Sequence, residues 1–356
     1  RLDSEIKSFA AYLRPSDGEH AARFRVIEEI SGLLNRSQGK RLLPNRAFLQ
    51  AFGSQVNGLA LANSDIDLNV WVNKPDAQDV QPGLRTLRNP RWLLKNFHER
   101  WLLPHKDWIL VAYRELRFPL ITAQHRLSGI DIQIVGAPST ANAQASVAHY
   151  LKKFPTLRDV FAVVRQMLDA RGFLDVYKGG MGSYSVFNMV VASYLHNPSE
   201  EKEGARVLAF LEFWAKHDLY GSCVSIDPPL IFPKIRKTGL TSTERKNMDQ
   251  KGWPYLLVLQ DPADPGNDLG KKTGAIKHIQ KTIMGVQEEL RKRLLDEREY
   301  PSLLAPLVGT SFDQIEARRE KVREYLKGGR RRDIKTVSSS ASSQLSGSNV
   351  PRALEE

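Results

Sequence analysis

The sequence predicts an α+β protein with a sheet-containing domain and a mostly helical domain. Residues 64–72 and 130–134 alternate polar and apolar side chains, which is the period of half-buried strands. From Asn142 onward the apolar residues instead recur at helical spacing. At 356 residues the chain is long enough to build two domains with separate cores.

The first part of the chain is expected to form a helix and then the sheet. Residues 3–36 carry apolar side chains at helical spacing. The sheet is expected within residues 48–135, with further strands at 107–113 and 117–122 and a helix at 90–104.

The second part is expected to be a set of helices. Thr156 and Asp159 have the spacing of a capping box at a helix start. The next helix is expected to begin at Ser183 or Ser185 and to end before Pro198. Two more helices are expected at 202–217 and 277–298.

Three aspartates are the strongest chemical signal. Asp65 and Asp67 alternate with apolar residues and face the same side of a strand, where two like charges repel unless a cation lies between them. Asp131 lies on the second alternating run, which a neighbouring strand would bring alongside. Carboxylates are ligands that Mg²⁺ prefers. The three predict a site for two ions, Mg²⁺ or Mn²⁺, for nucleotidyl transfer.

Roles within this site follow from the two-metal mechanism. Asp65 and Asp67 are assigned to both ions, and Asp131 to the ion that activates the attacking hydroxyl. Upstream, Gly53 allows backbone amides to approach a phosphate, and Ser54 offers a hydroxyl and an N–H. An isolated Asp-x-Asp pair usually lies on a solvated strand end or turn, so the prediction depends on the combination.

Two motifs in the second half resemble a known family. Residues 179–184, Gly-Gly-Met-Gly-Ser-Tyr, resemble the Gly-Gly-Leu-Ser-Ser-Tyr element of noncanonical poly(A) polymerases and terminal uridylyltransferases. Residues 260–268 resemble the nucleotide-recognition motif of the same enzymes, and residues 5–16 resemble the lead-in helix of TRAMP-complex poly(A) polymerases. The acidic triad is typical of the DNA polymerase β-type nucleotidyltransferase superfamily. The resemblance covers roughly residues 3–300.

The resemblance implies a domain organisation. A polymerase β-like nucleotidyltransferase domain with a mixed sheet is expected at 41–140. A helical central, PAP-associated domain is expected at 1–40 and 141–310, with the active site in the cleft between the two domains. A basic extension at 311–335 and a disordered Ser-rich tail at 336–356 are expected to follow.

The resemblance also implies nucleotide contacts. Ser54 and Ser183 would bind the phosphates, Tyr184 would stack on the base, and Asn142 would contact the ribose. Arg165 stands where the family carries a γ-phosphate-binding Lys, and a guanidinium differs from an ammonium in geometry.

Base choice is predicted from one position. Uridine-selective relatives carry a His where this sequence places Asn267, and adenylating relatives carry Asn, so ATP is the expected substrate rather than UTP. Asp264 is expected near the base edge, where it would accept a hydrogen bond from an exocyclic amine. The alternative is that Asp264 is a turn residue.

The function that the resemblance implies is a poly(A) polymerase. It would transfer AMP from ATP to an RNA 3′ end without a template, in nuclear RNA surveillance and exosome-linked decay. A zinc-knuckle RNA-binding protein and an RNA helicase are the expected partners. A nuclear location is implied by the resemblance, and a cytoplasmic one stays open.

Three alternatives remain. The first is a terminal uridylyltransferase, and the second is a catalytically silent platform that binds RNA or protein, against which the complete acidic triad argues. The third is a nucleotidyltransferase that acts on a small molecule or a protein, against which the two motifs of the second half argue.

Composition narrows the setting. The net charge of +12 and the pI near 9.7 suit a polyanionic partner. Residues 317–336 hold nine Lys and Arg against three acidic residues, a balance of +6 that suits RNA contact, nuclear import or a solvated tail. Cys223 is the single cysteine, so neither a disulfide framework nor a Cys-rich zinc site is expected, and a reducing compartment is implied.

The ends and the hydropathy of the chain give two further expectations. No apolar run is long enough to span a bilayer, so no membrane association is expected. The sequence begins at Arg1 without a Met or a signal pattern, so it is expected to be part of a longer protein whose targeting information lies elsewhere.

Overall fold

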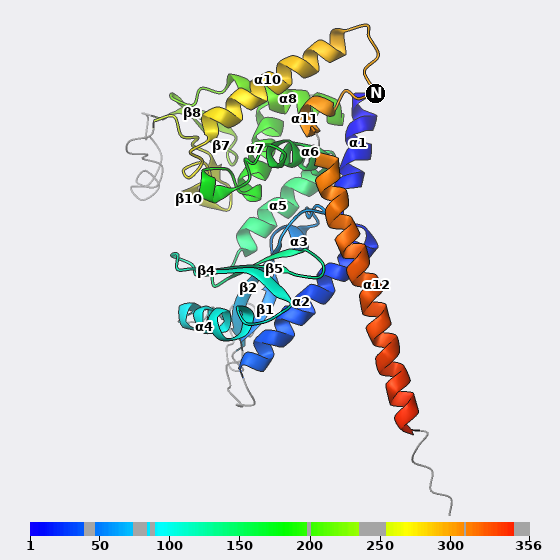
Figure 1. Ribbon diagram of the computed structural model, residues 1–356. Helices are drawn as coiled ribbons and strands as arrows, with labels where there is room; N and C mark the ends of the chain where they lie inside the picture. The colour runs from blue at the N-terminus through cyan, green and yellow to red at the C-terminus, as the bar shows by residue number, and fades with distance from the viewer. Residues whose placement is uncertain are drawn as a thin grey trace, which may run out of the picture. The chain divides into compact units, whose positions relative to one another are not determined.

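The computed structural model describes residues 1–38, 47–73, 84–85, 90–197, 201–234, 254–309 and 311–344 (Figure 1). The chain divides into two compact units, each made of three stretches of sequence. Unit 1 comprises Arg1–Arg14, Ala51–Leu61 and Pro138–Asp313. Unit 2 comprises Pro15–Gln50, Ala62–Ala137 and Gln314–Glu356.

Unit 2 is built around a mixed sheet in the strand order β1-β2-β6-β5-β4, with β3 paired to β2. The strands are β1 (Ala47–Ala51), β2 (Ile66–Asn73), β3 (Leu84–Arg85), β4 (Trp108–Arg114), β5 (Leu120–His125) and β6 (Asp131–Val135). Strands β2 and β6 run parallel. The pairs β2 with β3, β4 with β5, and β5 with β6 are antiparallel. The predicted α+β class with a mixed sheet is therefore confirmed.

Alternation along the two central strands separates a core face from a polar face. Ile66 and Leu68 of β2 and Ile132 and Ile134 of β6 are almost completely buried. The residues between them, such as Gln133, point to the other face, because successive side chains of a strand alternate. The predicted strands at 107–113 and 117–122 are found as β4 and β5, each shifted by a few residues.

Helices accompany the sheet in unit 2. They are α2 (Asp17–Ser37), α4 (Pro90–Phe97), the π-helical turn η1 (His98–Leu102) and most of α12 (Ser311–Gln344). The expected helix at 3–36 is in fact two helices, because α1 (Leu2–Leu13) ends just before Pro15 and Ser16 caps α2. Ser16 and Glu19 form a complete capping box there, with Glu19 N–H donating to the Ser16 hydroxyl at 3.3 Å.

Unit 1 is mostly helical. Its helices are α1, α3 (Ser54–Asn57), α5 (Ala141–Lys153), α6 (Leu157–Asp169), the 3-10 turn η2 (Val176–Lys178), α7 (Ser183–His196), α8 (Glu203–Lys216), α10 (Ile276–Leu295) and α11 (Ala305–Val308). Two small antiparallel pairs complete it, namely β7 (Ser222–Ser225) with β8 (Leu230–Pro233), and β9 (Gln260–Asp261) with β10 (Asp264–Asp268). Helix α6 packs against α1, α7, α8 and α11, and ten of its thirteen residues are buried, so it forms the centre of this core.

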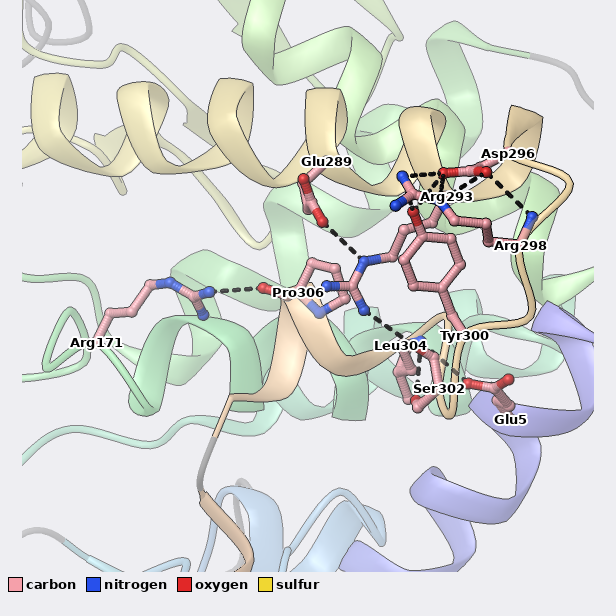
Figure 2. A network of polar contacts seen from close by, with 10 residues as sticks. All are labelled: Glu5, Arg171, Glu289, Arg293, Asp296, Arg298, Tyr300, Ser302, Leu304 and Pro306. Carbon is pink, nitrogen blue, oxygen red and sulfur yellow. Dashed lines mark hydrogen bonds and ion pairs between the residues drawn. The ribbon is translucent and has the colours of Figure 1, made fainter.

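A network of polar contacts ties the last segment of unit 1 onto its helices (Figure 2). Glu5 of α1 accepts hydrogen bonds from the Ser302 hydroxyl at 2.8 Å and from the Leu304 N–H at 3.0 Å. Arg293 of α10 donates to the Ser302 carbonyl at 3.0 Å, and Arg171 donates to the Pro306 carbonyl at 2.7 Å. The segment before α12 is thus held by α1, by α10 and by the turn that follows α6.

The observed units differ from the expected domains in three places. Helix α2 belongs with the sheet, residues 51–61 belong with the helices, and the chain after Gln314 belongs with the sheet. The backbone of α12 also stays helical through residues 336–344, where the Ser-rich composition predicted disorder. Extending an existing helix costs far less than starting one, which accounts for this continuation. Residues 345–356 lie outside the described residues.

In the parts of the chain that the structure describes, no helix combines the length and the apolar character needed to cross a membrane.

Candidate active site

The acidic residues lie on neighbouring parallel strands of unit 2. Ile66 is paired with Ile132 and Asp67 with Gln133, so Asp65 and Asp131, one residue earlier on each strand, are level with each other. Because Asp65 and Asp67 are two residues apart, their side chains share a face, and the same alternation places Asp131 beside them. The sheet therefore places the two predicted strands side by side, as expected.

Two glutamines that were not predicted hold these carboxylates. The Gln133 amide donates to Asp65 Oδ2 at 2.7 Å, and the Gln124 amide donates to Asp131 Oδ1 at 2.8 Å. Gln133 could have been found from the sequence, since it follows Asp131 by two residues on one strand face. Gln124 lies opposite Asp131 on the antiparallel strand β5, a register that the sequence does not reveal.

Asp131 has a second partner, Arg318 of α12. Its guanidinium lies 3.0 Å from Asp131 Oδ2 and donates to the Asn63 carbonyl at 2.8 Å. Burial raises the pKa of Asp131, and the nearby charge of Asp65 raises it further, whereas the hydrogen bonds from Gln124 and Arg318 act in the opposite direction. Both oxygens of this carboxylate are therefore engaged within unit 2.

The donor set suits a hard divalent cation. Mg²⁺ commonly takes only one or two carboxylates and completes its shell with water and substrate phosphates. Asp65, Asp67 and Asp131 supply oxygen ligands on adjacent strands of one face. As the side chains lie, no cluster of three acidic, His or Cys groups among the described residues is placed to hold a metal. The three aspartates therefore suit a divalent cation by their oxygen ligands and by their position on adjacent strands. Arg318 is paired with one of them, Asp131.

The Gly53-Ser54 turn belongs to unit 1. Gly53 has φ 63° and ψ −138°, a backbone conformation that favours glycine, and its carbonyl accepts the N–H of Val56 at 3.1 Å. Ser54 is the first residue of the short helix α3, which packs against α5. Arg158 of α6 donates to the Gly58 carbonyl at 2.6 Å and so fixes the far end of the turn.

Tyr184 and Asn267 are joined through one carboxylate, that of Asp261. The Tyr184 hydroxyl donates to Asp261 Oδ1 at 2.8 Å, and the Asn267 amide nitrogen donates to Asp261 Oδ2 at 3.0 Å. Asp261 is buried, and it was not among the predicted site residues. Burial raises the pKa of Tyr184, and the charge of Asp261 raises it further, so the phenol stays a donor. These two hydrogen bonds hold the start of α7 beside the β9–β10 pair.

Arg165 and Ser183 also meet. The Arg165 Nε donates to the Ser183 hydroxyl at 3.2 Å, and Arg165 is nearly buried at the centre of the helical core. Gly180 precedes Ser183 in a tight turn, where an added Cβ would lie 2.4 Å from the Phe173 carbonyl oxygen. This turn fixes the start of α7, the helix that carries Ser183 and Tyr184.

The other two predicted contacts lie on the surface of unit 1. Asn142 is the second residue of α5 and is exposed. Asp264 is exposed at the start of β10, and its carboxylate accepts the Gly266 N–H at 3.1 Å, which is the turn role given above as the alternative. A role of either residue in binding nucleotide stays a prediction.

Part of the basic extension is paired within the protein. Arg318 lies against Asp131, and Arg319 lies 3.3 Å from Glu19 of α2. Arg323 pairs at 2.7 Å with Glu320 on its own helix. The positive balance of residues 317–336 is therefore partly used for holding α12 on unit 2.

Comparison with known proteins finds similarity to poly(A) RNA polymerases. Residues 2–135 match the family model described as "Poly(A) RNA polymerase, mitochondrial-like, central palm domain". Poly(A) RNA polymerase protein 2 of Saccharomyces cerevisiae is 28% identical over 309 residues, which cover 83% of this chain and 48% of the yeast protein. The chain thus spans about half the length of the curated relatives it matches.

Solved structures share the fold. The polymerase core of TRAMP, an RNA surveillance complex, matches with a TM-score of 0.67 at 24% identity, covering 86% of this chain and 94% of that one. A cytoplasmic RNA terminal U-transferase matches with a TM-score of 0.60 at 17% identity, covering 86% of this chain and 96% of the other. The fold is that of polymerase β-like nucleotidyltransferase cores.

Proposed function

We propose that this chain, a homologue of the poly(A) RNA polymerases in the noncanonical poly(A) polymerase family, transfers AMP from ATP to the 3′-hydroxyl of RNA without a template. The oxygen of the RNA 3′-hydroxyl attacks the α-phosphorus of ATP, and pyrophosphate leaves. The observation that carries the proposal is the parallel register of β2 and β6, which sets Asp131 level with Asp65.

The acidic face of unit 2 would bind the reacting groups. Polymerase cores of this kind generally use divalent metal ions and nucleoside triphosphates. Asp65, Asp67 and Asp131 would hold two ions, Mg²⁺ or Mn²⁺, which when bound lower the pKa of the attacking hydroxyl and neutralise the leaving pyrophosphate. The glutamines beside these aspartates restrict the carboxylate orientations, as Gln133 does for Asp65 at 2.7 Å.

Unit 1 would bind the nucleotide. Ser54 follows Gly53 on a turn where a phosphate could come close to the backbone amides. Ser183 lies beside Arg165. Both serines would donate hydrogen bonds to the triphosphate. Tyr184 would stack on the base, and Asn142 would contact the ribose. Arg165 brings a fork of donors where relatives have a Lys, so it is suited to gripping two phosphate oxygens at once.

Adenine preference is supported by the orientation of Asn267. A carboxylate only accepts hydrogen bonds, so Asp261 draws the Asn267 amide nitrogen toward itself at 3.0 Å. The Asn267 carbonyl oxygen is then left as an acceptor. Adenine offers an exocyclic amine as its donor, whereas uracil offers a carbonyl at the corresponding place. The fold shared with the U-transferase makes uridylyl transfer the second candidate.

The proposed acceptor, partners and cellular process are inferred from the similarity to poly(A) polymerases. RNA 3′ ends are the acceptors, and a zinc-knuckle RNA-binding protein and an RNA helicase are the proposed partners, in nuclear RNA surveillance. The sheet of unit 2 would belong to the proposed catalytic domain, and the helices of unit 1 to the proposed central domain.

Extension of a 5′-labelled single-stranded RNA, with each of the four NTPs separately and with Mg²⁺ or Mn²⁺, tests the proposal. An ATP-dependent ladder that is lost in the Asp65→Ala/Asp67→Ala variant is expected. A ladder with UTP alone would replace adenylyl by uridylyl transfer. Specific ATP binding without any extension would identify a binding platform instead.

A further inference from the structure

Helix α12 is anchored on unit 2 by both apolar and polar contacts. Val322 and Tyr325 are buried. The Tyr325 hydroxyl donates to Glu29 at 2.7 Å, and the Arg25 guanidinium lies over the Tyr325 ring at 5.1 Å from its centre. With the Arg319–Glu19 ion pair, these contacts fix the direction in which the first half of α12 presents its other side chains.

Arg318 of α12 reaches the acidic face with its side chain. Its guanidinium bridges the Asn63 carbonyl, two residues before Asp65, and the Asp131 carboxylate. It therefore places a positive charge against one of the three carboxylates proposed to bind divalent ions. The side chain of Arg318 is 42% exposed, so the ion pair is solvated and weak.

We infer that Arg318 is a built-in counter-cation of Asp131, which a divalent ion must displace, so that docking of α12 through Arg318 and cation binding at Asp131 oppose each other. This inference rests on the proposed metal role of the three aspartates. A guanidinium and a divalent cation repel each other, and the Asp131 oxygen that faces Arg318 can neutralise only one of them at a time.

The arrangement has a functional consequence. With the site free of metal, Arg318 offsets the repulsion between Asp131 and Asp65, whose charges face each other across β2 and β6. Cation occupancy then requires a concentration high enough to replace Arg318, and any event that withdraws this part of α12 lowers that concentration.

The first test measures Mn²⁺ binding to the whole chain by electron paramagnetic resonance of the free ion, without nucleotide or RNA. Arg318→Met is expected to bind Mn²⁺ about two- to fivefold more tightly than the wild type, as the loss of a half-exposed ion pair predicts. Arg323→Met is the matched control, since Arg323 has the same charge on the same helix and pairs with Glu320 and Glu316. Equal or weaker Mn²⁺ binding by Arg318→Met would overturn the inference, as would equal tightening in both variants.

A second test needs no change at Arg318. Adding Mn²⁺ to the wild type is expected to speed hydrogen exchange of α12 amides within 315–328, and Asp67→Asn is expected to abolish this response. Unchanged exchange on full Mn²⁺ occupancy would contradict the coupling. If the wild type and Asp67→Asn bind no Mn²⁺ at all, the metal assignment in the proposed function fails, and the inference fails with it.

Discussion

The Tyr184 hydroxyl donates a hydrogen bond of 2.8 Å to the Asp261 carboxylate, whose other oxygen accepts from Asn267. One buried acid thus fixes both the ring proposed to stack on the base and the amide proposed to read it. Asp261 is a positioning residue in this account, because it acts through Tyr184 and Asn267.

Replacing Asp261 by Asn is expected to weaken base discrimination. An amide in place of the carboxylate also donates hydrogen bonds, so the orientation of Asn267 is no longer fixed. We expect the ratio of kcat/KM for ATP to that for UTP to fall about tenfold, in line with the loss of one charge-assisted hydrogen bond. Single-nucleotide addition kinetics measure it. A uniform loss with both nucleotides would indicate a purely structural role.

Replacing Asn267 by His is expected to move the preference toward UTP. The larger side chain reduces the room for a purine and supplies a ring N–H donor for the uracil carbonyl. Competition between ATP and UTP in single-nucleotide addition measures the change. Lys271→Gln, a change at an exposed residue shortly after β10, is the control. Equal effects of the two substitutions would count against Asn267 as the base-reading residue.

Alanine substitutions at Gly180 and Gly182 are expected to differ in their effect on the free energy of unfolding. A Cβ at Gly180 would lie 2.4 Å from the Phe173 carbonyl oxygen, so Gly180→Ala is expected to lower the free energy of unfolding by about 1–3 kcal/mol. Gly182 has φ −67°, and its nearest neighbour to an added Cβ lies at 3.8 Å, so Gly182→Ala is expected to change stability by less than about 0.5 kcal/mol. Urea unfolding measures both. Similar losses would show that the turn is not set by this close approach.

The ionisation of Glu29 is expected to make the free energy of unfolding depend on pH. The hydrogen bond with His125 is the main cause that lowers the Glu29 pKa below its usual 4.5, and Tyr325 and Arg25 also face it and lower the pKa. Because the folded-state pKa is lower, the ionised form stabilises the folded state fully above about pH 4.5 and this contribution is lost as the pH falls.

Unfolding by urea from pH 3 to 6 checks this expectation. Glu29→Gln is expected to flatten the loss of stability below pH 4.5, whereas Glu28→Gln, a change at the exposed neighbour on α2, is expected to keep the wild-type slope. An unchanged slope in Glu29→Gln would contradict the role of the Glu29–His125–Tyr325 contacts in holding α12.

Local patterns in the sequence predicted the acidic strands well. Alternation in residues 64–72 and 130–134 located β2 and β6, because burial of one face imposes a period of two. The break between α1 and α2 was missed, although Pro15, Ser16 and Glu19 together encode it. In this case the capping signal should have outweighed the continuous apolar spacing.

Contacts between distant segments could not be predicted from the sequence. Gln124 faces Asp131 only because β5 pairs antiparallel with β6 in one particular register. Arg318 lies 187 positions from Asp131, and its run of basic neighbours suggested an RNA contact rather than an internal ion pair. The link through Asp261 likewise depends on how the β9–β10 pair meets the start of α7.

The most direct test of the central claim is to supply a single-stranded RNA with an equimolar mixture of all four NTPs and Mg²⁺ and to sequence the added 3′ nucleotides. Tails that are mainly adenylate are expected in the wild type, and no tails are expected in Asp65→Ala/Asp67→Ala. Tails that are mainly uridylate, or tails of equal yield in the double variant, would contradict it.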